Sequence, residues 1–458
     1  PFIIFSMAGG YLADRFSKRS VAIGVKLGEI GIMTLALFAL GGNQPLPLLL
    51  AVFLMGTHSA FFGPVKYGLL PELLPEKKLS WGNGVIELGT FLAIVAGTIG
   101  GGWLFEVFTG QHIWTGFILI GLAVIGAIWS FGITRIPAAD PTKTFRLNFI
   151  SDLWQKGQVI RRDRILLLAI VGNTYFFFLA ALVQQYTIYS YGKDLLGLSE
   201  GQITAWLMSA VALGIGFGSY AAGRLSGNKI EYGLIPLGSL GMTLTGAFLA
   251  FPNPTTSGTI VALALYGFFC GFFIVPVTAL IQHRPERSDK GAIIAAGNLL
   301  SFVGIFIAAG VYYVIAGLLQ LSPRQIFLAT TLMTVVGTSY AMWLLPDAVL
   351  RFIMWIATHT IYRIKVLGRD NIPAKGGALF VCNHLSLVDA CLLQAAVERP
   401  VRFIMLKAMY EKPVIGWWAK TTGAIPISSE LRPREMIKSL QAASDALKNG
   451  EVVCIFAE

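Results

Sequence analysis

Long apolar segments separated by short polar loops fill the first three quarters of the chain. A helix needs about 20 predominantly apolar residues to cross a bilayer. The sequence predicts ten such helices, at 20–41, 46–70, 83–107, 112–134, 165–190, 202–225, 232–251, 257–281, 291–319 and 323–346. Residues 1–11 (PFIIFSMAGGY) are typical of the end of a further span, whose first part we expect to precede Pro1. The pattern predicts an all-α polytopic membrane protein up to residue 346.

Charge is scarce in the chain and unevenly distributed. Of the 458 residues, 55% are hydrophobic and 13% are charged, against about 25% charged in an ordinary soluble domain. This composition excludes a soluble globular chain, a disordered chain and a disulfide-stapled chain. Among residues 1–346, 35 are charged, whereas 24 of the last 112 are. We therefore expect a membrane domain at 1–346, an interfacial helix or linker at 347–366, and an aqueous domain at 367–458.

The basic residues indicate which loops face the cytoplasm. Of the 21 Lys and Arg residues before Pro346, 17 lie in alternate loops, at 12–19, 71–82, 135–164, 224–231 and 282–290. The intervening loops hold only Lys193 and Arg324. Because Lys and Arg are enriched in cytoplasmic loops, we expect these five loops and the segment after Pro346 to be cytoplasmic. The net charge of +11 then reflects topology and contact with membrane lipids, and no nucleic-acid partner is expected.

The long loop 135–164 divides the spans into two halves, each of six helices once a span before Pro1 is counted. Residues 10–19 (GYLADRFSKR) and 219–228 (SYAAGRLSGN) align at a constant offset, with Tyr11 over Tyr220 and Arg15 over Arg224. Six-helix halves related by a repeat are typical of one large class of transporters. The first of these loops resembles the G-x3-D-R-x-G-R-R loop of the major facilitator superfamily. The resemblance implies that this is a conformational gating loop, with the residues Gly10, Asp14, Arg15, Lys18 and Arg19.

Residues 56–102 carry a more specific resemblance. The segments AFFGPVKYGLLPELLP and NGVIELGTFLAIVAGT resemble the lysophospholipid transporter branch of the same superfamily. The resemblance covers residues 1–346. It implies that the membrane domain moves lysophospholipids from the outer to the inner leaflet of the bacterial inner membrane.

Polar and ionisable residues inside predicted spans are costly in lipid, and by default they indicate a transport path. The candidates are Lys26, Glu29, Lys66, Asn83 and Glu87. A zwitterionic headgroup needs an anion for its amine and a cation for its phosphate, which Glu87 or Glu29 and Lys66 or Lys26 can supply. Alternatively, Lys26 with Glu29, and Lys66 with Glu87, form structural ion pairs. Further polar residues of the spans are Asn173, Gln184, Gln185 and Asn298.

The aqueous domain contains a histidine and an aspartate at the end of a predicted strand. The apolar segment GGALFVC is followed by NHLSLVD and then by an apolar helix. His384 and Asp389 lie on either side of the turn between the predicted strand and the helix, so both can face one cleft. A neutral imidazole can take a proton from a hydroxyl group while a carboxylate orients the ring and stabilises the imidazolium. The pattern predicts general-base catalysis on a hydroxyl that the substrate supplies.

Two further segments, GAIPIS at 423–428 and IFAE at 455–458, follow in order. Together with N-H-x4-D they resemble the sequence blocks of the glycerolipid acyltransferases. The resemblance implies that His384 is the general base and Asp389 its orienting partner. It implies substrate-binding roles for Asn383, Gly423, Ile425, Pro426 and Glu458. Ser429 stands where that family has an arginine for glycerol phosphate, which leaves this contact to another cation such as Arg432. The fourth block of the family is not reached, so we expect a partial α/β acyltransferase domain, inactive if the polypeptide ends at Glu458.

The two resemblances imply a fusion of a lysophospholipid transporter with an acyltransferase, similar to the bacterial 2-acylglycerophosphoethanolamine acyltransferase fusions. In these, an acyl-carrier-protein ligase domain often follows. We expect inward movement of lysophosphatidylethanolamine and reacylation of its free glycerol hydroxyl by an acyl thioester. The expected donor is an acyl carrier protein or coenzyme A thioester, with acyl carrier protein as a partner protein and no metal or other cofactor.

The charges of the aqueous domain indicate where it lies in the cell. We expect a monomer in the inner membrane whose cytoplasmic tail is held at anionic membrane lipids by the cations Arg402, Lys407, Lys412 and Lys420. The four cysteines lack metal-type spacing and are expected to be free thiols. A competing hypothesis is a transporter of another small amphiphile, whose acyltransferase-like tail is a non-catalytic regulatory or anchoring module.

Overall fold

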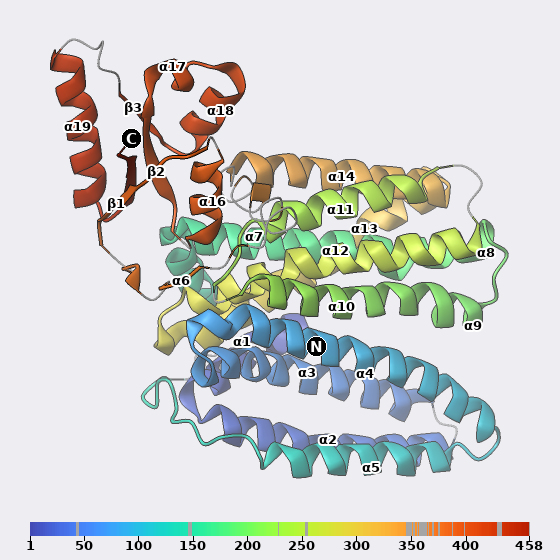
Figure 1. Ribbon diagram of the computed structural model, residues 1–458. Coiled ribbons are helices and arrows are strands. Elements are labelled where there is room, and N and C mark those ends of the chain that lie inside the picture. Colours follow the sequence, from blue (N-terminus) through green and yellow to red (C-terminus); the bar gives the residue numbers. More distant parts are fainter. Residues whose placement is uncertain are drawn as a thin grey trace. The chain divides into compact units, whose positions relative to one another are not determined.

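The computed structural model divides the chain into two units (Figure 1). The helical unit comprises residues 1–231 and 237–338, and the C-terminal unit comprises residues 232–236 and 339–458. The structure describes residues 1–42, 45–144, 149–227, 229–251, 255–344, 350, 353–354, 356, 364, 366–368, 371–373, 376–386, 388–397, 399–427 and 433–457. Most of the predicted interfacial helix at 347–366 lies outside these residues.

The first half of the helical unit is built from long helices that follow the apolar segments. They are α1 (Phe2–Arg15), α2 (Lys18–Gly41), α3 (Pro45–Leu73), the short 3-10 turn η1 (Glu76–Lys78), α4 (Leu79–Val107) and α5 (Ile113–Ser130). A linker containing α6 (Phe149–Arg162) joins them to the second half. The helices α2 to α5 correspond to the first four predicted spans. α2, α3 and α4 extend by a few residues beyond the predicted bounds, whereas α5 ends at Ser130, four residues before the predicted end.

The second half repeats this arrangement with more irregular helices. Its elements are α7 (Arg164–Ala180), η2 (Ala181–Thr187), α8 (Ile188–Asp194), α9 (Glu200–Gln202), η3 (Ile203–Met208), α10 (Ser209–Leu225), α11 (Leu234–Leu249), α12 (Thr256–His283), η4 (Arg287–Asp289), α13 (Lys290–Tyr312), η5 (Tyr313–Leu318) and α14 (Pro323–Leu344). The segments η2, η3 and η5 are π-helical turns continuous with their neighbouring α-helices. Short π-helical turns of this kind are frequent at functional sites.

The described residues contain nine helices long and apolar enough to span a membrane, and α11 is a shorter apolar helix. Each of the ten predicted spans therefore has a helix. Large apolar side chains lie exposed on their surfaces, including Trp129 at 79% and Phe306 at 73% exposure. In a water-soluble protein such a surface would be unfavourable, so it indicates contact with lipid.

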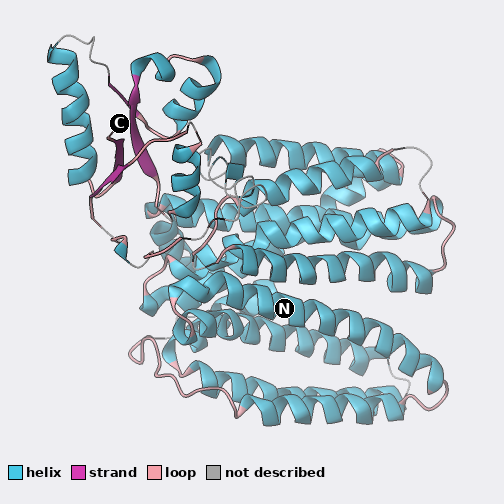
Figure 2. Ribbon diagram, viewed as in Figure 1, coloured by secondary structure: helices cyan, strands magenta, loops and turns pink. Residues whose placement is uncertain are grey.

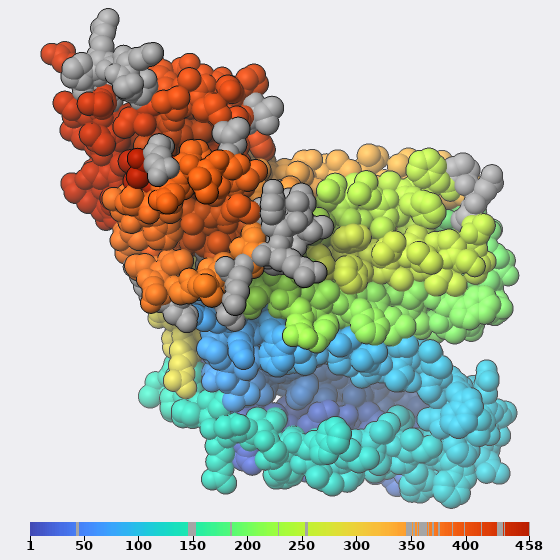
Figure 3. Space-filling model, viewed as in Figure 1, coloured from blue at the N-terminus to red at the C-terminus, as the bar shows by residue number. Residues whose placement is uncertain are grey.

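Two pairs of helices make the most extensive contacts between the two halves. α1 packs against α13, and α4 packs against α10. The repeat found in the sequence aligns α1 with α10. The contact of α1 with α13 in one half-to-half pair therefore corresponds to the contact of α10 with α4 in the other. Figure 3 shows the green helices of the second half directly against the blue helices of the first half. The structure thus confirms a transporter fold of two related halves.

The C-terminal unit is a small α/β layer (Figure 2). Its elements are β1 (Ala378–Cys382), α16 (Asp389–Ala396), β2 (Val401–Leu406), α17 (Lys407–Tyr410), α18 (Pro413–Thr421), β3 (Ile425–Ile427), α19 (Pro433–Lys448) and β4 (Val452–Phe456). The strands run parallel in the order β1-β4-β2-β3. Ala443 and Ala446 of α19 pack on one face of this sheet, and α16 and α18 contribute to the core on the other. The carboxyl ends of all four strands therefore meet along one edge, where α/β proteins commonly bind ligands.

Candidate functional site

One end of the helical unit holds Arg15, Lys18, Arg19, Lys77 and Lys78, and we call it the basic end. Asp14, the penultimate residue of α1, is fully buried there. Its carboxylate accepts hydrogen bonds from the backbone N–H groups of Gly291 and Ala292, at 2.8 and 3.0 Å, in the first turn of α13. Lys143 Nζ of the linker donates to the same carboxylate at 2.7 Å. A carboxylate here satisfies free N–H groups and opposes the positive end of the helix dipole. Asp14 therefore ties the first half to the second half and to the linker.

Other residues of the predicted gating loop hold neighbouring segments of the first half. Lys18 Nζ lies 2.6 Å from Glu72 Oε1, and both side chains are almost completely buried. Arg19 donates to two backbone carbonyls just after α5, at 2.7 and 2.9 Å. Arg15 donates to the backbone carbonyl of Lys143. The loop thus fastens both α5 and the linker to the start of α2.

Two amide side chains from opposite halves form a reciprocal pair close to the basic end. Asn83 Nδ2 of α4 donates to Gln282 Oε1 of α12 at 2.7 Å, and Gln282 Nε2 donates back to Asn83 Oδ1 at 2.9 Å. Both residues are fully buried. The helices α1 and α13 also lie close together at Gly10. A Cβ atom at this position would lie only 2.6 Å from Ala295 Cβ, so the close approach requires glycine. These contacts close the basic end between the halves.

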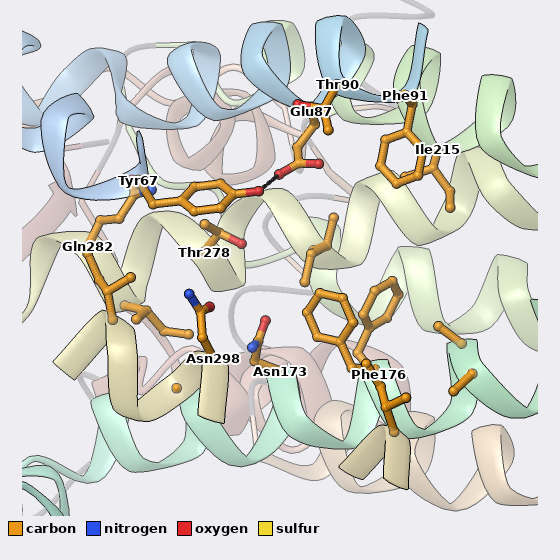
Figure 4. A pocket seen from close by; sticks show the side chains of 18 residues that line it. Tyr67, Glu87, Thr90, Phe91, Asn173, Phe176, Ile215, Thr278, Gln282 and Asn298 are labelled. Atoms are coloured by element: carbon orange, nitrogen blue, oxygen red, sulfur yellow. Dashed lines mark hydrogen bonds between the residues drawn. The ribbon is translucent and has the colours of Figure 1, made fainter. Parts of the chain in front are cut away.

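A cavity of about 330 Å³ lies between the two halves, inward from this closure (Figure 4). Its wall is drawn from α3, α4, α7, η2, α10, α12 and α13. Apolar side chains such as Phe176 and Ile215 form part of the wall, and the polar side chains include Asn173, Gln282 and Asn298. A mostly apolar cavity with a few polar groups is typical of a binding site for a small amphiphile.

Glu87 is the one charged side chain among the described residues that line the cavity. Its Oε1 accepts a hydrogen bond of 2.7 Å from the hydroxyl of Tyr67, as the dashed line in Figure 4 shows. Lys66 Nζ donates to Thr90 Oγ1 at 2.7 Å, and Thr90 lies one helical turn from Glu87 on α4. The same Nζ lies 5.1 Å from the centre of the Tyr67 ring. The structure therefore brings Lys66 and Glu87 into one polar network rather than a direct ion pair.

Lys26 and Glu29 lie elsewhere in the first half. Lys26 Nζ contacts Glu29 Oε2 at 2.7 Å, and the buried His58 places Nε2 3.2 Å from the same oxygen. None of the three lines the cavity. For Lys26 and Glu29 the geometry matches the alternative of a structural ion pair, with His58 as an additional neighbour.

In the C-terminal unit, His384 follows β1 and Asp389 begins α16. His384 Nδ1 lies 3.2 Å from Asp389 Oδ2. The same oxygen accepts hydrogen bonds from the backbone N–H groups of Leu385, at 2.6 Å, and Ser386, at 2.8 Å. The N–H groups of Ser386 and Leu385 hold the pKa of Asp389 below its usual range. A charged Asp389 favours the tautomer with a proton on Nδ1, which leaves Nε2 of His384 as a base.

The other predicted residues of this unit lie on different strands. Asn383 is exposed beside His384 at the carboxyl edge of the sheet. Gly423 adopts φ +69°, a conformation that favours glycine, and ends α18. Ile425 and Pro426 pair with β2, and Ile425 is buried in the core under α19. Gly423, Ile425 and Pro426 thus shape the strand that leads to residues 428–432. Glu458, Ser429 and Arg432 lie outside the described residues.

Some side chains of the cavity could not be recognised from the sequence. Tyr67 was missed because an aromatic residue in an apolar span is usually part of the packing. Gln282 was missed because the predicted span ended at residue 281, whereas α12 continues to His283. Asn173 and Asn298 do lie in the wall, and Asn173 also donates to Ser301 Oγ at 2.8 Å. The side chains of Gln184 and Gln185 lie outside the described part of the chain.

Comparison with known families gives two matches along the chain. Residues 1–309 match the Major Facilitator Superfamily, and residues 363–458 match the acyltransferase family. The lysophospholipid transporter LplT of Klebsiella pneumoniae subsp. pneumoniae is 30% identical over 324 residues, which cover 68% of this chain and 76% of that protein. Corresponding transporters of Salmonella are 29% identical over 318 residues.

Solved structures resemble the helical unit in fold. The E. coli fucose:proton symporter FucP superimposes with a TM-score of 0.60 at 13% identity, covering 75% of this chain and 88% of the symporter. The human organic anion transporter MFSD10 gives a TM-score of 0.62 at 15% identity, covering 74% of this chain and 80% of that protein. At such low identity these similarities bear on the fold alone.

Proposed function

Since the chain belongs to the Major Facilitator Superfamily and continues into an acyltransferase domain, we propose that it imports a lysophospholipid and reacylates it. The lipid, lysophosphatidylethanolamine, moves from the outer to the inner leaflet of a bacterial inner membrane. The observation that carries the proposal is the occurrence, in one chain, of a helical unit related to lysophospholipid transporters and a His384–Asp389 pair at the carboxyl edge of a parallel sheet.

The cavity supports this choice of substrate. Glu87 offers a carboxylate oxygen to a primary ammonium group, and the Tyr67 hydroxyl holds the carboxylate in place. Lys66 of α3 is not among the described residues that line the cavity, but it donates to Thr90, which does line it one helical turn from Glu87 on α4. It thereby provides a nearby cation for the phosphate. A volume of about 330 Å³ is small for a whole lipid. We propose that it receives the polar headgroup while the single acyl chain lies among the apolar side chains.

Topology supports the direction of transport. The basic end carries the loops rich in Lys and Arg, so it faces the cytoplasm. In this conformation Asp14, Asn83 and Gln282 close that end. Release of the lipid into the inner leaflet therefore requires these contacts to break. The chain acts as a monomer, since both halves of the path belong to one polypeptide.

The acyl transfer uses the free glycerol hydroxyl of the imported lipid. His384 Nε2 accepts the hydroxyl proton as the oxygen attacks the carbonyl carbon of an acyl thioester. The carbon–sulfur bond then breaks, and the proton passes from His384 to the leaving thiolate. Asp389 stabilises the imidazolium between these steps through its contact with Nδ1. An acyl carrier protein or coenzyme A thioester is the donor.

Transport and acylation can be tested separately in the full-length protein. Uptake of labelled lysophosphatidylethanolamine is measured in spheroplasts, and the diacyl product is quantified. Glu87→Gln is expected to reduce uptake of lysophosphatidylethanolamine by about tenfold, the effect of weakening one charge-assisted contact. Uptake of lysophosphatidylglycerol, which has no amine, serves as the matched control and should change little. Equal loss for both lipids would contradict an ammonium-binding role of Glu87.

The enzymatic claim is tested by His384→Ala. This variant is expected to leave lysophospholipid uptake intact and to lower formation of the diacyl product by about 10²–10⁴-fold. If the diacyl product forms at the wild-type rate, the acyl-transfer mechanism is wrong. If neither lysophospholipid enters through the wild-type protein, the competing hypothesis of a different amphiphile is favoured.

A further inference from the structure

The imidazole of His384 is held from two directions. In the plane of the ring, Nδ1 faces Asp389 Oδ2 at 3.2 Å. On one face, the ring stacks on Phe456, with centroids 4.5 Å apart and an angle of 29° between the planes. The side chain of His384 is 35% exposed, so the stacking covers one face while access remains elsewhere. The two contacts restrict different motions of the ring.

Phe456 reaches His384 because of the order of the strands. β1 and β4 are parallel neighbours, and Cys382 of β1 lies opposite Phe456 of β4. His384 comes two residues after Cys382, just beyond the strand. The end of β4 therefore lies beside the loop that carries the proposed base.

Phe456 is itself fixed by the core of the C-terminal unit. Its ring stacks on Phe403 of β2, with centroids 6.0 Å apart and planes within 5° of parallel. Phe403 is 2% exposed and contacts the ring of Trp418 in α18 at 5.8 Å. A row of aromatic rings thus connects the loop residue His384 to the buried face of the sheet.

The described residues on either side of His384 are open to solvent. Leu385 is 92% exposed, and Asn383 and Ser386 are exposed as well. The contact with Asp389 is long for a hydrogen bond to a charged group, and the accepting oxygen is shared with two backbone N–H groups. A ring held by this contact alone retains freedom to rotate about its Cβ–Cγ bond.

We propose that Phe456 is a positioning residue for His384. Its ring holds the imidazole in the orientation in which Nδ1 meets Asp389 and Nε2 points away from the core, toward the acceptor hydroxyl. This inference rests on the proposed acyl transfer and assigns to that site a residue outside the His–Asp pair. Phe456 does not touch the substrate and acts through His384.

The test compares variants of the full-length protein in the acyl-transfer assay. Phe456→Leu removes the stacked ring and keeps an apolar side chain, whereas Phe456→Tyr keeps the ring. The leucine variant is expected to lower kcat by about tenfold, the upper range of an aromatic pair contact, with KM for both substrates unchanged. The tyrosine variant is expected to restore kcat to within about twofold of wild type. Ile455→Val, which alters the neighbouring position of β4, is the control for a general loss of packing.

Folding is checked by the thermal unfolding temperature of each variant. If Phe456→Leu is unstable, Phe456→Met replaces it, because methionine fills irregular space without an aromatic face. Three results would each overturn the inference. The leucine or methionine variant could keep the wild-type kcat, its change could be confined to KM, or the tyrosine variant could lose as much kcat as the leucine variant. An inactive wild-type protein would overturn the proposed acyl transfer and this inference with it, whereas an active wild type with an active leucine variant overturns the inference alone.

Discussion

Asn83 of α4 and Gln282 of α12 exchange two hydrogen bonds across the boundary between the halves, and both residues are fully buried. Gln282 also lines the cavity, while Asn83 lies one helical turn from Glu87 in the direction of the basic end. The amide pair therefore separates the cavity from the basic end. Any passage between α4 and α12 requires the two side chains to part.

Replacing Gln282 by methionine should loosen this closure. The substitution preserves the length of the side chain but leaves the buried oxygen of Asn83 without its donor, which costs about 1–3 kcal/mol. We expect the amide hydrogens of residues 79–86 to exchange roughly tenfold faster in the variant, as measured by hydrogen–deuterium exchange with mass spectrometry. Thr278→Val, one turn earlier on α12 and outside the pair, is the control. Unchanged exchange in Gln282→Met would show that the pair does not hold the closed state.

Gly10 should be intolerant of even one added carbon. A Cβ atom at this position would lie 2.6 Å from Ala295 Cβ and 2.9 Å from the carbonyl oxygen of Gly291. Gly10→Ala should therefore force α1 and α13 apart, at a cost of about 1–3 kcal/mol. Gly24→Ala in α2 is the control, because among the described residues no heavy atom beyond its own helical backbone and chain neighbours lies within 4 Å of its Cβ position. Thermal unfolding in detergent should give a lower midpoint for Gly10→Ala, and an unchanged or higher one for Gly24→Ala.

Asp163 should contribute stability that depends on pH. It caps α7 through the N–H groups of Ile165 and Leu166 and accepts a hydrogen bond of 2.8 Å from Arg284 Nε. The hydrogen bond from Arg284 is the largest of the interactions that lower the pKa of Asp163. A carboxyl group with a lowered folded pKa stabilises the fold above its unfolded pKa, about 3.9, and this contribution is lost as pH falls through the folded value.

The measurement is the unfolding midpoint of wild type and Asp163→Asn between pH 3 and 7. Asparagine is also a good cap, so the difference reports the charge. We expect the variant to be less stable at pH 7 and the difference to shrink once the pH falls below about 4. Arg284→Gln should show the same trend. A difference that stays constant over this range would rule out a charge effect.

Asp389 should matter for the rate of acyl transfer more than for substrate binding. In Asp389→Asn, the side-chain oxygen can still accept from the backbone, but the preference for a proton on Nδ1 of His384 is lost. We expect kcat to fall by about 10²–10⁴-fold with little change in KM. Because the pKa of Asp389 is lowered, its ionisation should add no step to the wild-type rate profile at roughly neutral pH, from about pH 6 to about pH 9. A large rise in KM would indicate a substrate contact instead.

The spans and the two related halves could be predicted because membrane crossing imposes a length and a composition on each helix. Which helices meet could not be predicted. Lys143 and Asp14 are 129 residues apart, and neither position has a local pattern that indicates the other. Lys26 and Glu29, by contrast, are neighbours on one helix, so their pairing could be foreseen as an alternative.

The same distinction holds in the C-terminal unit. His384 and Asp389 lie on either side of one turn, so their spacing allowed the prediction that both face one cleft, and the structure places them in contact. Phe456 comes from β4, at the far end of the domain, and reaches His384 only because β4 pairs with β1. Strand order depends on tertiary packing, and local sequence patterns do not specify it.

The contacts of Gly10 with Gly291, and of Gly84 with Ser219, bring main chain against main chain where the halves meet. At these two points no side chain of Gly10 or Gly84 stands between the helices. Directional bonds also cross this boundary, among them those of Asp14. Because those bonds come from backbone N–H groups in the first turn of α13, they fix the register in which α1 meets α13. Close backbone contact and directional bonds together define a single register for the closed boundary.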